Sequence, residues 1–401
     1  MNLSLRPQPY PYEAMLAICS DLDETPDAST YFETCRFLNT RQETRMGQGV
    51  GLEVGNTIYF AMPREQFSYY NADDRDRERI HDLIRSGHID CLHSFGDLVD
   101  KREEVIAAWD ALDAHGCRIE VWIDHGTAKS NFDAGIMFGE GATPGAACFH
   151  ADVSIGRGIK YVWKGRVTSV IAKDAPVSLK AIFRREHPVE SAKTIAREAA
   201  KIALARLGSP KYRMHCEPDI MRNTRLESGH EVIEFIRSNP SWGSVSHNET
   251  ADGIHEVLTE AVLDQLVAQR GTTIIYTHLG KTRGSLPIPV KSAEAFRLLG
   301  RYAEQGRILV ATTRRLLGFR HALRSVHWTA SQSGSQLSIE ISTESCTSDD
   351  LAGLCWYVPE TVREATATID GGEYLPMVRN APDATGKPSV SIPWARLEFP
   401  E

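Results

Sequence analysis

Asp21 and Asp23 are the residues whose type and spacing most directly suggest chemistry. They close the segment Ile18–Asp23, whose first residues continue an apolar run. On an extended backbone, side chains two residues apart point to the same side, so both carboxylates would face one site. Like charges held that close need a metal ion, a proton or a base beside them. One acid could bind a divalent metal while the other acts as general base on water, although either could instead cap the helix expected at Ala28–Asn39.

Three histidines also end strand-like runs, at His93, His125 and His278. Asp97 follows His93 by four residues, a spacing that lets both reach one metal ion from a single turn. His125 is a candidate third ligand or a substrate contact. His278 is a candidate general acid, because imidazole titrates near neutral pH. The alternative for each is a polar loop residue or a hydrogen-bonded core histidine.

Three further polar residues are candidates for binding substrate. His150 and Asp152 form a short histidine–carboxylate pair after a glycine-rich loop that lacks the ending of a phosphate-binding P-loop. Arg222 lies in a polar stretch that we expect to precede a helix ending at Arg237. It could hold a sugar or a carboxylate, or it could belong to a solvated face.

The elements that must position these residues alternate between strands and helices over about the first 325 residues. Apolar runs predict strands at Met15–Ser20, Thr57–Met62, Ile89–His93, Arg118–Ile123, Ile159–Trp163, Val167–Ile171, Thr272–Thr277 and Ile308–Thr312. Amphipathic helices between them indicate a parallel sheet with helices outside. Parallel strands end on one side, where α/β barrels and sheets gather their chemistry, so the acids and histidines should meet there.

The pattern changes after residue 325. Short alternating segments separated by glycine and proline clusters predict strands at Leu337–Ile341, Leu354–Val358, Ala365–Ile369 and Val390–Trp394. We therefore predict an α/β catalytic domain over residues 1–325 and a small antiparallel β domain over residues 326–401.

Composition narrows the class of protein. The net charge is −8 and there is no dense block of lysine and arginine, which argues against binding nucleic acid. No apolar run reaches the length of a membrane span, and we expect no signal peptide. The eight cysteines form no Cys-x-x-Cys pair, which favours a reduced, cytoplasmic setting. His81, His88 and His115 lie on predicted helices or at their ends and are interpreted as surface residues.

These motifs resemble the polysaccharide deacetylase (NodB-type carbohydrate esterase) superfamily over about residues 14–324. The segment Ser20–Asp23 resembles its first motif, in which the first acid is the base and the second binds metal. His93–Asp97 resembles its metal-binding His-Ser/Thr-x-x-His motif, and Ile275–His278 resembles its final catalytic-acid motif. The chain differs in having Leu22 between the acids and Asp97 in place of the second histidine, and its arginine-containing third motif is not recognisable.

The resemblance implies a distorted (β/α) barrel of the polysaccharide deacetylase type that binds a divalent metal, expected to be zinc. Asp23 and His93, with Asp97 or His125, would hold the metal, Asp21 would be the base and His278 the acid. The expected activity is hydrolysis of an amide or ester on a carbohydrate, in the making or tailoring of surface polysaccharide. Alternatives are a metal-independent glycoside hydrolase using Asp21 or Asp23 with Asp152, and a non-catalytic carbohydrate-binding protein.

Overall fold

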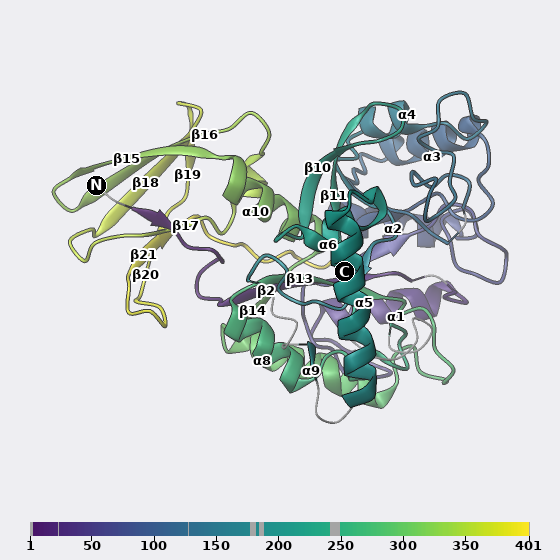
Figure 1. Cartoon of the computed structure of the whole chain (residues 1–401), viewed down its shortest axis with the longest axis horizontal. Helices are drawn as coiled ribbons and strands as arrows, with labels where there is room; N and C mark the ends of the chain where they lie inside the picture. The colour runs from purple at the N-terminus through teal and green to yellow at the C-terminus, as the bar shows by residue number, and fades with distance from the viewer. Residues whose placement is uncertain are drawn as a thin grey trace.

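The computed structural model describes residues 3–22, 24–126, 128–176, 182–183, 188–240 and 249–400, so the predicted metal ligand Asp23 lies outside the described residues. Its centre is a curled, almost entirely parallel sheet surrounded by helices, with the C-terminal strands to one side (Figure 1). This is a mixed α/β architecture that is compatible with the expected distorted barrel.

The central sheet contains eleven strands in the described chain. Their bounds are β2 (Ala14–Ser20), β5 (Gly55–Ile58), β6 (Ile89–His93), β7 (Val121–Ile123), β8 (Tyr161–Trp163), β9 (Val167–Thr168), β10 (Met221–Arg225), β11 (Glu231–Phe235), β12 (Arg237–Ser238), β13 (Thr272–Thr277) and β14 (Ile308–Val310). The spatial order is β10-β11-β8-β7-β6-β5-β2-β13-β12-β9, with β14 also on β2. Only β10 and β11 pair antiparallel in this sheet.

Two bent chain segments supply strands to both ends of this sheet. In residues 161–168, β8 is followed after three residues by β9, and in residues 231–238, β11 is followed after one residue by β12. β8 pairs with β11 at one end of the strand order, while β9 pairs with β12 at the other. The curl of the sheet therefore brings its two ends towards each other.

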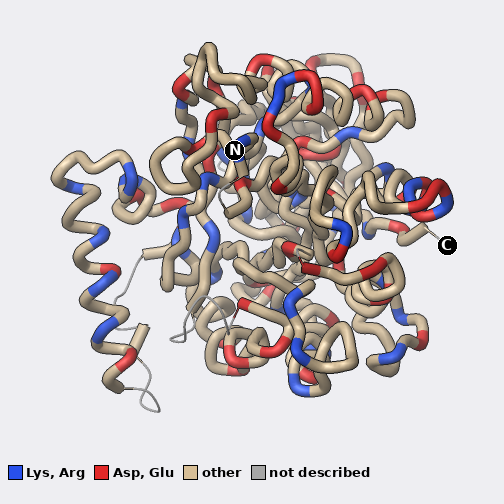
Figure 2. Tube along the Cα trace, turned by 90° about the vertical axis from the view of Figure 1, so that its right-hand side faces the viewer, with Lys and Arg blue, Asp and Glu red and all other residues tan. Residues whose placement is uncertain are grey.

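Each face of the sheet has its own apolar core. One core joins the sheet to helices α1 (Ala28–Asn39), α2 (Asp74–Arg85), α3 (Arg102–Ala114), α8 (Glu260–Gln269) and α9 (Val290–Glu304). The other joins side chains such as Cys91, Val121 and Phe235 to α10 (Thr313–Ser325) and the C-terminal strands. The longest described helix, α5 (Pro188–Arg206), runs along the periphery (Figures 1 and 2), and α4 (Ala151–Gly156) and α6 (Arg213–Cys216) are short.

The C-terminal strands form two four-stranded sheets. One has the order β15 (His327–Ser333), β16 (Gln336–Ser342), β18 (Glu364–Ile369) and β19 (Glu373–Leu375). The other has the order β1 (Ser4–Leu5), β17 (Cys355–Tyr357), β21 (Ser389–Ser391) and β20 (Val378–Asn380). The prediction of purely antiparallel pairing is wrong at one place, where β16 and β18 run parallel because a long connection through β17 returns the chain to the same end. The predicted boundary at residue 325 stays a prediction.

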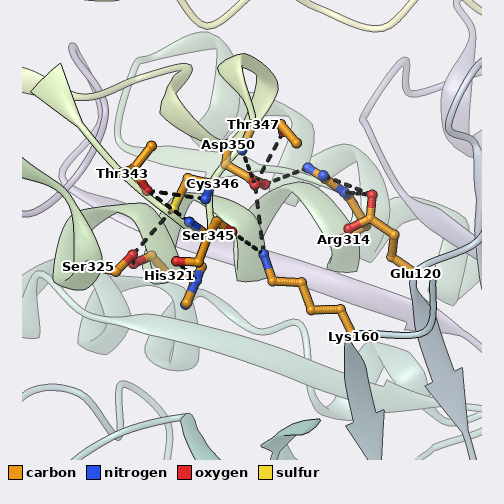
Figure 3. A network of polar contacts seen from close by, with 10 residues as sticks. All are labelled: Glu120, Lys160, Arg314, His321, Ser325, Thr343, Ser345, Cys346, Thr347 and Asp350. Carbon is orange, nitrogen blue, oxygen red and sulfur yellow. Dashed lines mark hydrogen bonds and ion pairs between the residues drawn. The ribbon is translucent and has the colours of Figure 1, made fainter. Parts of the chain in front are cut away.

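A polar network attaches these strands to the starts of β7 and β8 (Figure 3). Arg314 on α10 bonds Glu120 at 2.9 Å and Asp350 at 2.8 Å. Lys160 donates to the backbone oxygen of Ser345 at 2.8 Å. Because the contacts lie at the amino ends of parallel strands, the C-terminal strands cover the edge of the sheet opposite the predicted site.

Other sequence predictions can be compared directly with the structure. The predicted helix ending at Arg237 is wrong, because that stretch forms β11 and β12. The interpretation of His81 and His88 as surface residues is also wrong, since both are buried, whereas His115 is exposed. Positive and negative side chains are interspersed along the described trace (Figure 2). In the described parts of the chain, no helix combines the length and the apolar character needed to cross a membrane.

Candidate functional site

The carboxyl ends of neighbouring strands place the predicted residues in one row. β2 and β13 are in register with Ser20 opposite Thr277, so Asp21 and His278 follow at adjacent strand ends. His93 is the last residue of β6, and His125 follows β7 by two residues. Tyr59, directly after β5, fills the place between β2 and β6. Local chain geometry and sheet topology therefore gather residues far apart in the sequence.

Asp21 is the fully buried centre of this row. Its Oδ2 lies 2.8 Å from Nη1 of Arg237 and 3.1 Å from Nε2 of His93. Burial alone would raise the pKa of Asp21, but the positive charge of Arg237 and the hydrogen-bonding ring of His93 outweigh it and hold the pKa well below its usual range. The carboxylate is therefore ionised in a setting that normally excludes charge.

Arg237 was not recognised as a site residue from the sequence. It begins β12, beside β13, and its side chain is completely buried. Its guanidinium carbon lies 3.7 Å from the ring centre of Trp163 and 4.7 Å from that of Tyr276, so aromatic faces replace part of its solvation. Its Nε and Nη2 find no hydrogen-bond partner among the described residues. No local signal placed Arg237 at the sheet edge, because the run Glu231–Phe235 before it fits a helix face as well as a buried strand.

His93 and His125 pack around Tyr59. The ring of Tyr59 stacks on His93 with centroids 4.6 Å apart, and its hydroxyl lies 3.3 Å from Nδ1 of His125. The two imidazole centroids are 4.7 Å apart. Nε2 of His125 lies 3.3 Å from Oδ1 of Asp97, and the hydrogen bond to His125 lowers the pKa of Asp97. The structure thus brings together His93, His125 and Asp97, three of the four predicted metal ligands.

The loop after β7 fixes the position of His125. Asn131 accepts a hydrogen bond from the His125 backbone N–H at 2.7 Å and donates to its carbonyl oxygen at 3.0 Å. Asp124 accepts from the Trp122 indole at 2.7 Å and from the Phe132 N–H at 2.8 Å. Through these contacts the loop after β7 holds His125 beside the strand end.

His278 has two polar neighbours. Its Nε2 lies 3.1 Å from the hydroxyl of Tyr276, and its Nδ1 lies 3.9 Å from Oε2 of Glu249. Burial lowers the pKa of His278 to about 4, although nearby Asp21 opposes this shift. Burial raises the pKa of Glu249 to about 7. The ring of His278 is therefore neutral near pH 7, with a buried carboxyl group behind it.

The three predicted substrate contacts have other partners. His150 is fully buried on the helical side of the sheet, and its ring nitrogens each lie 2.8 Å from an oxygen, of Ser154 and of Ser130. Asp152 forms a two-pronged pair with Arg102 at 2.7 Å. Arg222 lies 3.2 Å from Glu234. Among the described residues, none of these contacts joins the three side chains to Asp21, and their role in substrate binding stays a prediction.

The donors in the row fit a divalent metal chemically. Imidazole nitrogens and carboxylate oxygens are the ligands that zinc accepts, and the row offers both kinds on neighbouring strand ends. Since Asp23 lies outside the described residues, a ligand set that includes it is not defined by the geometry. Of the described residues, one group has at least three ligand atoms close enough to share an ion, and it lies elsewhere, at Glu78, His81 and His115.

Comparison with known proteins assigns no relative. No protein-family model, no curated protein and no solved structure matches the chain.

Proposed function

We propose that this protein is a metal-dependent hydrolase that removes an acyl group from a carbohydrate, on a distorted barrel of the polysaccharide deacetylase type. One observation carries the proposal: a fully buried Asp21 is held between Arg237 and His93, beside His278 on the adjacent strand. Burying an ionised acid costs several kcal/mol of desolvation free energy, which attraction to its charged partners must offset. Such arrangements of perturbed charges are concentrated at functional sites.

The metal would be zinc, held by Asp23 and His93 together with Asp97 or His125. When bound, a divalent ion supplies Lewis-acid polarisation of the acyl carbonyl and activation of water. The pairing of His125 with Asp97 and the stacking of Tyr59 on His93 support this choice, because they orient both rings before any ion arrives.

The residues of the chain would carry the protons. Asp21 accepts a proton from the attacking water, whose oxygen forms the new bond to the acyl carbon. Arg237 keeps Asp21 ionised and oriented through its bond to Oδ2. The acyl C–N or C–O bond breaks, and His278 gives a proton to the departing nitrogen or oxygen. Because His278 is neutral near pH 7, the proton that it gives must first come to it. Asp21 passes the proton taken from water to the imidazole of His278, which delivers it to the departing atom, so both residues end the reaction as they began.

Release of acetate tests the proposal. The full chain, freed of metal and then supplied with zinc, is incubated with N- and O-acetylated sugars and their oligosaccharides. We expect zinc-dependent acetate release, lowered roughly 10²- to 10⁴-fold by Asp21→Asn and by His278→Gln, as for other general acid–base groups. Asp110→Asn and His327→Gln, two exposed positions, are the matched controls and should retain activity.

Two results would contradict the proposal. One is the absence of acetate release from every acetylated sugar in the presence of zinc, with circular dichroism showing a folded protein. The other is full activity in Asp21→Asn. The same substrates can be followed for glycosidic cleavage, so that reducing ends appearing without acetate would instead support a glycoside hydrolase acting on surface polysaccharide.

A further inference from the structure

Glu78, His81 and His115 form a second cluster of metal-binding side chains, apart from the candidate site. Glu78 and His81 lie one turn apart on α2, and His115 is the C-cap of α3. One ligand atom from each lies within 4.8 Å of the other two. Both helices lead, through their C-terminal ends, into the amino ends of β6 and β7. The cluster therefore lies towards the opposite edge of the sheet from Asp21.

Half of a metal site is already in place. Oε2 of Glu78 lies 3.3 Å from Nδ1 of His81. Two ligands of a tetrahedral zinc ion with bonds of about 2.0–2.1 Å lie about 3.4 Å apart. On its other side, Nε2 of His81 lies 2.9 Å from the hydroxyl of Tyr69. If Nε2–H donates to Tyr69, Nδ1 presents its lone pair towards Glu78, which is the arrangement of a histidine ligand with an outer hydrogen-bond partner.

His115 is the ligand whose ring must turn to complete the metal site. Its ring stacks on His81 with centroids 3.9 Å apart and planes inclined by 22°. A nitrogen lone pair lies in the plane of its ring, so two nearly parallel rings cannot both face one ion. His115 is exposed, whereas His81 is buried, so His115 can turn its ring while His81 stays fixed.

The surrounding charges favour a cation. Oε1 of Glu78 bonds Nη2 of Arg85 at 2.9 Å, which leaves Oε2 facing His81. Arg85 also bonds Asp82 at 2.6 Å. Two carboxylates and one guanidinium give this corner a net charge of −1, so an arriving divalent ion meets a negative site.

We infer that Glu78, His81 and His115 bind a zinc ion, with water as the fourth ligand, and that this ion ties α2 to α3. The ligand class is a borderline divalent cation, since imidazole with carboxylate suits zinc, and cobalt and nickel can replace it. The inference does not rest on the proposed hydrolase activity, because none of the three ligands belongs to that site.

Zinc stoichiometry tests the inference. The metal-free full chain and its His115→Ala variant are titrated with Zn²⁺ by calorimetry, and with Co²⁺ by its visible absorption. We expect His115→Ala to bind one ion fewer than the wild type, whether or not a second ion binds near His93. Tyr69→Phe should retain the ion with an affinity about 10- to 100-fold lower, because only the orienting hydroxyl is lost. His327→Ala, at an exposed histidine on β15, is the control.

Thermal unfolding gives an independent measurement. Zinc should raise the melting temperature of the wild type more than that of His115→Ala or Glu78→Gln, while the three proteins should melt alike without metal. Both substitutions are at exposed positions and should leave folding intact. Equal zinc stoichiometry and affinity in the wild type and His115→Ala would overturn the inference. If the wild type binds one more zinc ion than His115→Ala but releases no acetate from acetylated sugars, the hydrolase proposal fails and the zinc-site inference stands.

Discussion

Arg237, which is buried, and Arg314, which is partly buried, show two uses of an arginine at opposite edges of the same sheet. The side chain of Arg314 is 17% exposed, and its Nε, Nη1 and Nη2 all bond carboxylates, of Glu120 and Asp350. The side chain of Arg237 is 0% exposed and bonds one carboxylate through Nη1, leaving Nε and Nη2 without a hydrogen-bond partner among the described residues. The arginine that joins two parts of the fold uses every branch of its guanidinium, whereas the one in the candidate site does not.

The difference indicates that the two regions have different roles. Unpaired donors in a dry interior lower stability, by about 1–3 kcal/mol for each buried group left unsatisfied. A fold that needed only cohesion would gain by pairing or replacing Arg237. Among the described residues, the unpaired Nε and Nη2 of Arg237 beside Asp21 are expected where a substrate or ion completes the set of partners.

Substitution of Arg237 should have the largest effect on stability. Arg237→Met leaves the Asp21 carboxylate buried without its strongest partner, and we expect the free energy of unfolding to fall by about 3–5 kcal/mol. Urea unfolding of the variant measures this loss. The double variant Arg237→Met/Asp21→Asn should recover much of it, because no uncompensated charge remains. A double variant as unstable as Arg237→Met would mean that the loss comes from packing on Trp163.

Substitution of Arg314 should cost less. Arg314→Met removes bonds to two carboxylates, but Glu120 can still be hydrated and Asp350 keeps its bond from the backbone N–H of Thr347 at 3.0 Å. We expect a loss of about 2–3 kcal/mol, in the range of hydrogen bonds to charged groups. Urea unfolding again measures the loss, and acetate release should be unaffected. A cost greater than that of Arg237→Met would reverse the comparison between the two edges.

His150 extends the comparison to histidines. Burial lowers its pKa from 6.5 to about 4, so the unfolded chain binds more protons between these values. The stability from this residue is complete above pH 6.5 and is lost as the pH falls towards 4. From about pH 7.5 to about pH 5 the loss should be about 2 kcal/mol. His150→Gln cannot titrate, so urea unfolding at both pH values should show a weaker pH dependence in the variant. An equal pH dependence of the unfolding free energy in the wild type and His150→Gln would contradict the lowered pKa of His150.

The smallest effect is expected at Asp152. Its pair with Arg102 is substantially exposed on both sides, so Asp152→Asn should change the free energy of unfolding by less than about 1 kcal/mol. The same variant tests the predicted substrate contact. If Asp152 touches sugar, KM rises while stability is unchanged, and if KM is unchanged, the pair with Arg102 is its whole role.

The strands bearing the site could be predicted from the sequence because apolar runs end in polar residues there. Predicted Ile89–His93 and Thr272–Thr277 coincide with β6 and β13. The convergence of Asp21, His93 and His278 follows from parallel pairing, which the alternation of strands and helices indicated. Their proximity was thus accessible without coordinates.

Arg237 could not be found in this way because its role depends on non-local contacts. The run Glu231–Phe235 fits a helix face and a buried strand equally well, and only pairing with β8 decides between them. Likewise, His81 looked like a surface residue because its helix is highly charged, yet its side chain points towards Tyr69. In both cases the deciding partner lies in another element, which local periodicity does not report.

Ser4–Leu5 leads to a practical consequence for work with fragments. This first strand pairs with Cys355–Tyr357 in a C-terminal sheet, and α10 shares an apolar core with the same region. A fragment that ends at residue 325 would therefore leave Ser4–Leu5 without its partner strand and expose the apolar face of α10 to water. Co-expressing residues 1–325 with residues 326–401 offers a remedy, since the two pieces carry complementary halves of one interface and could assemble as a split protein.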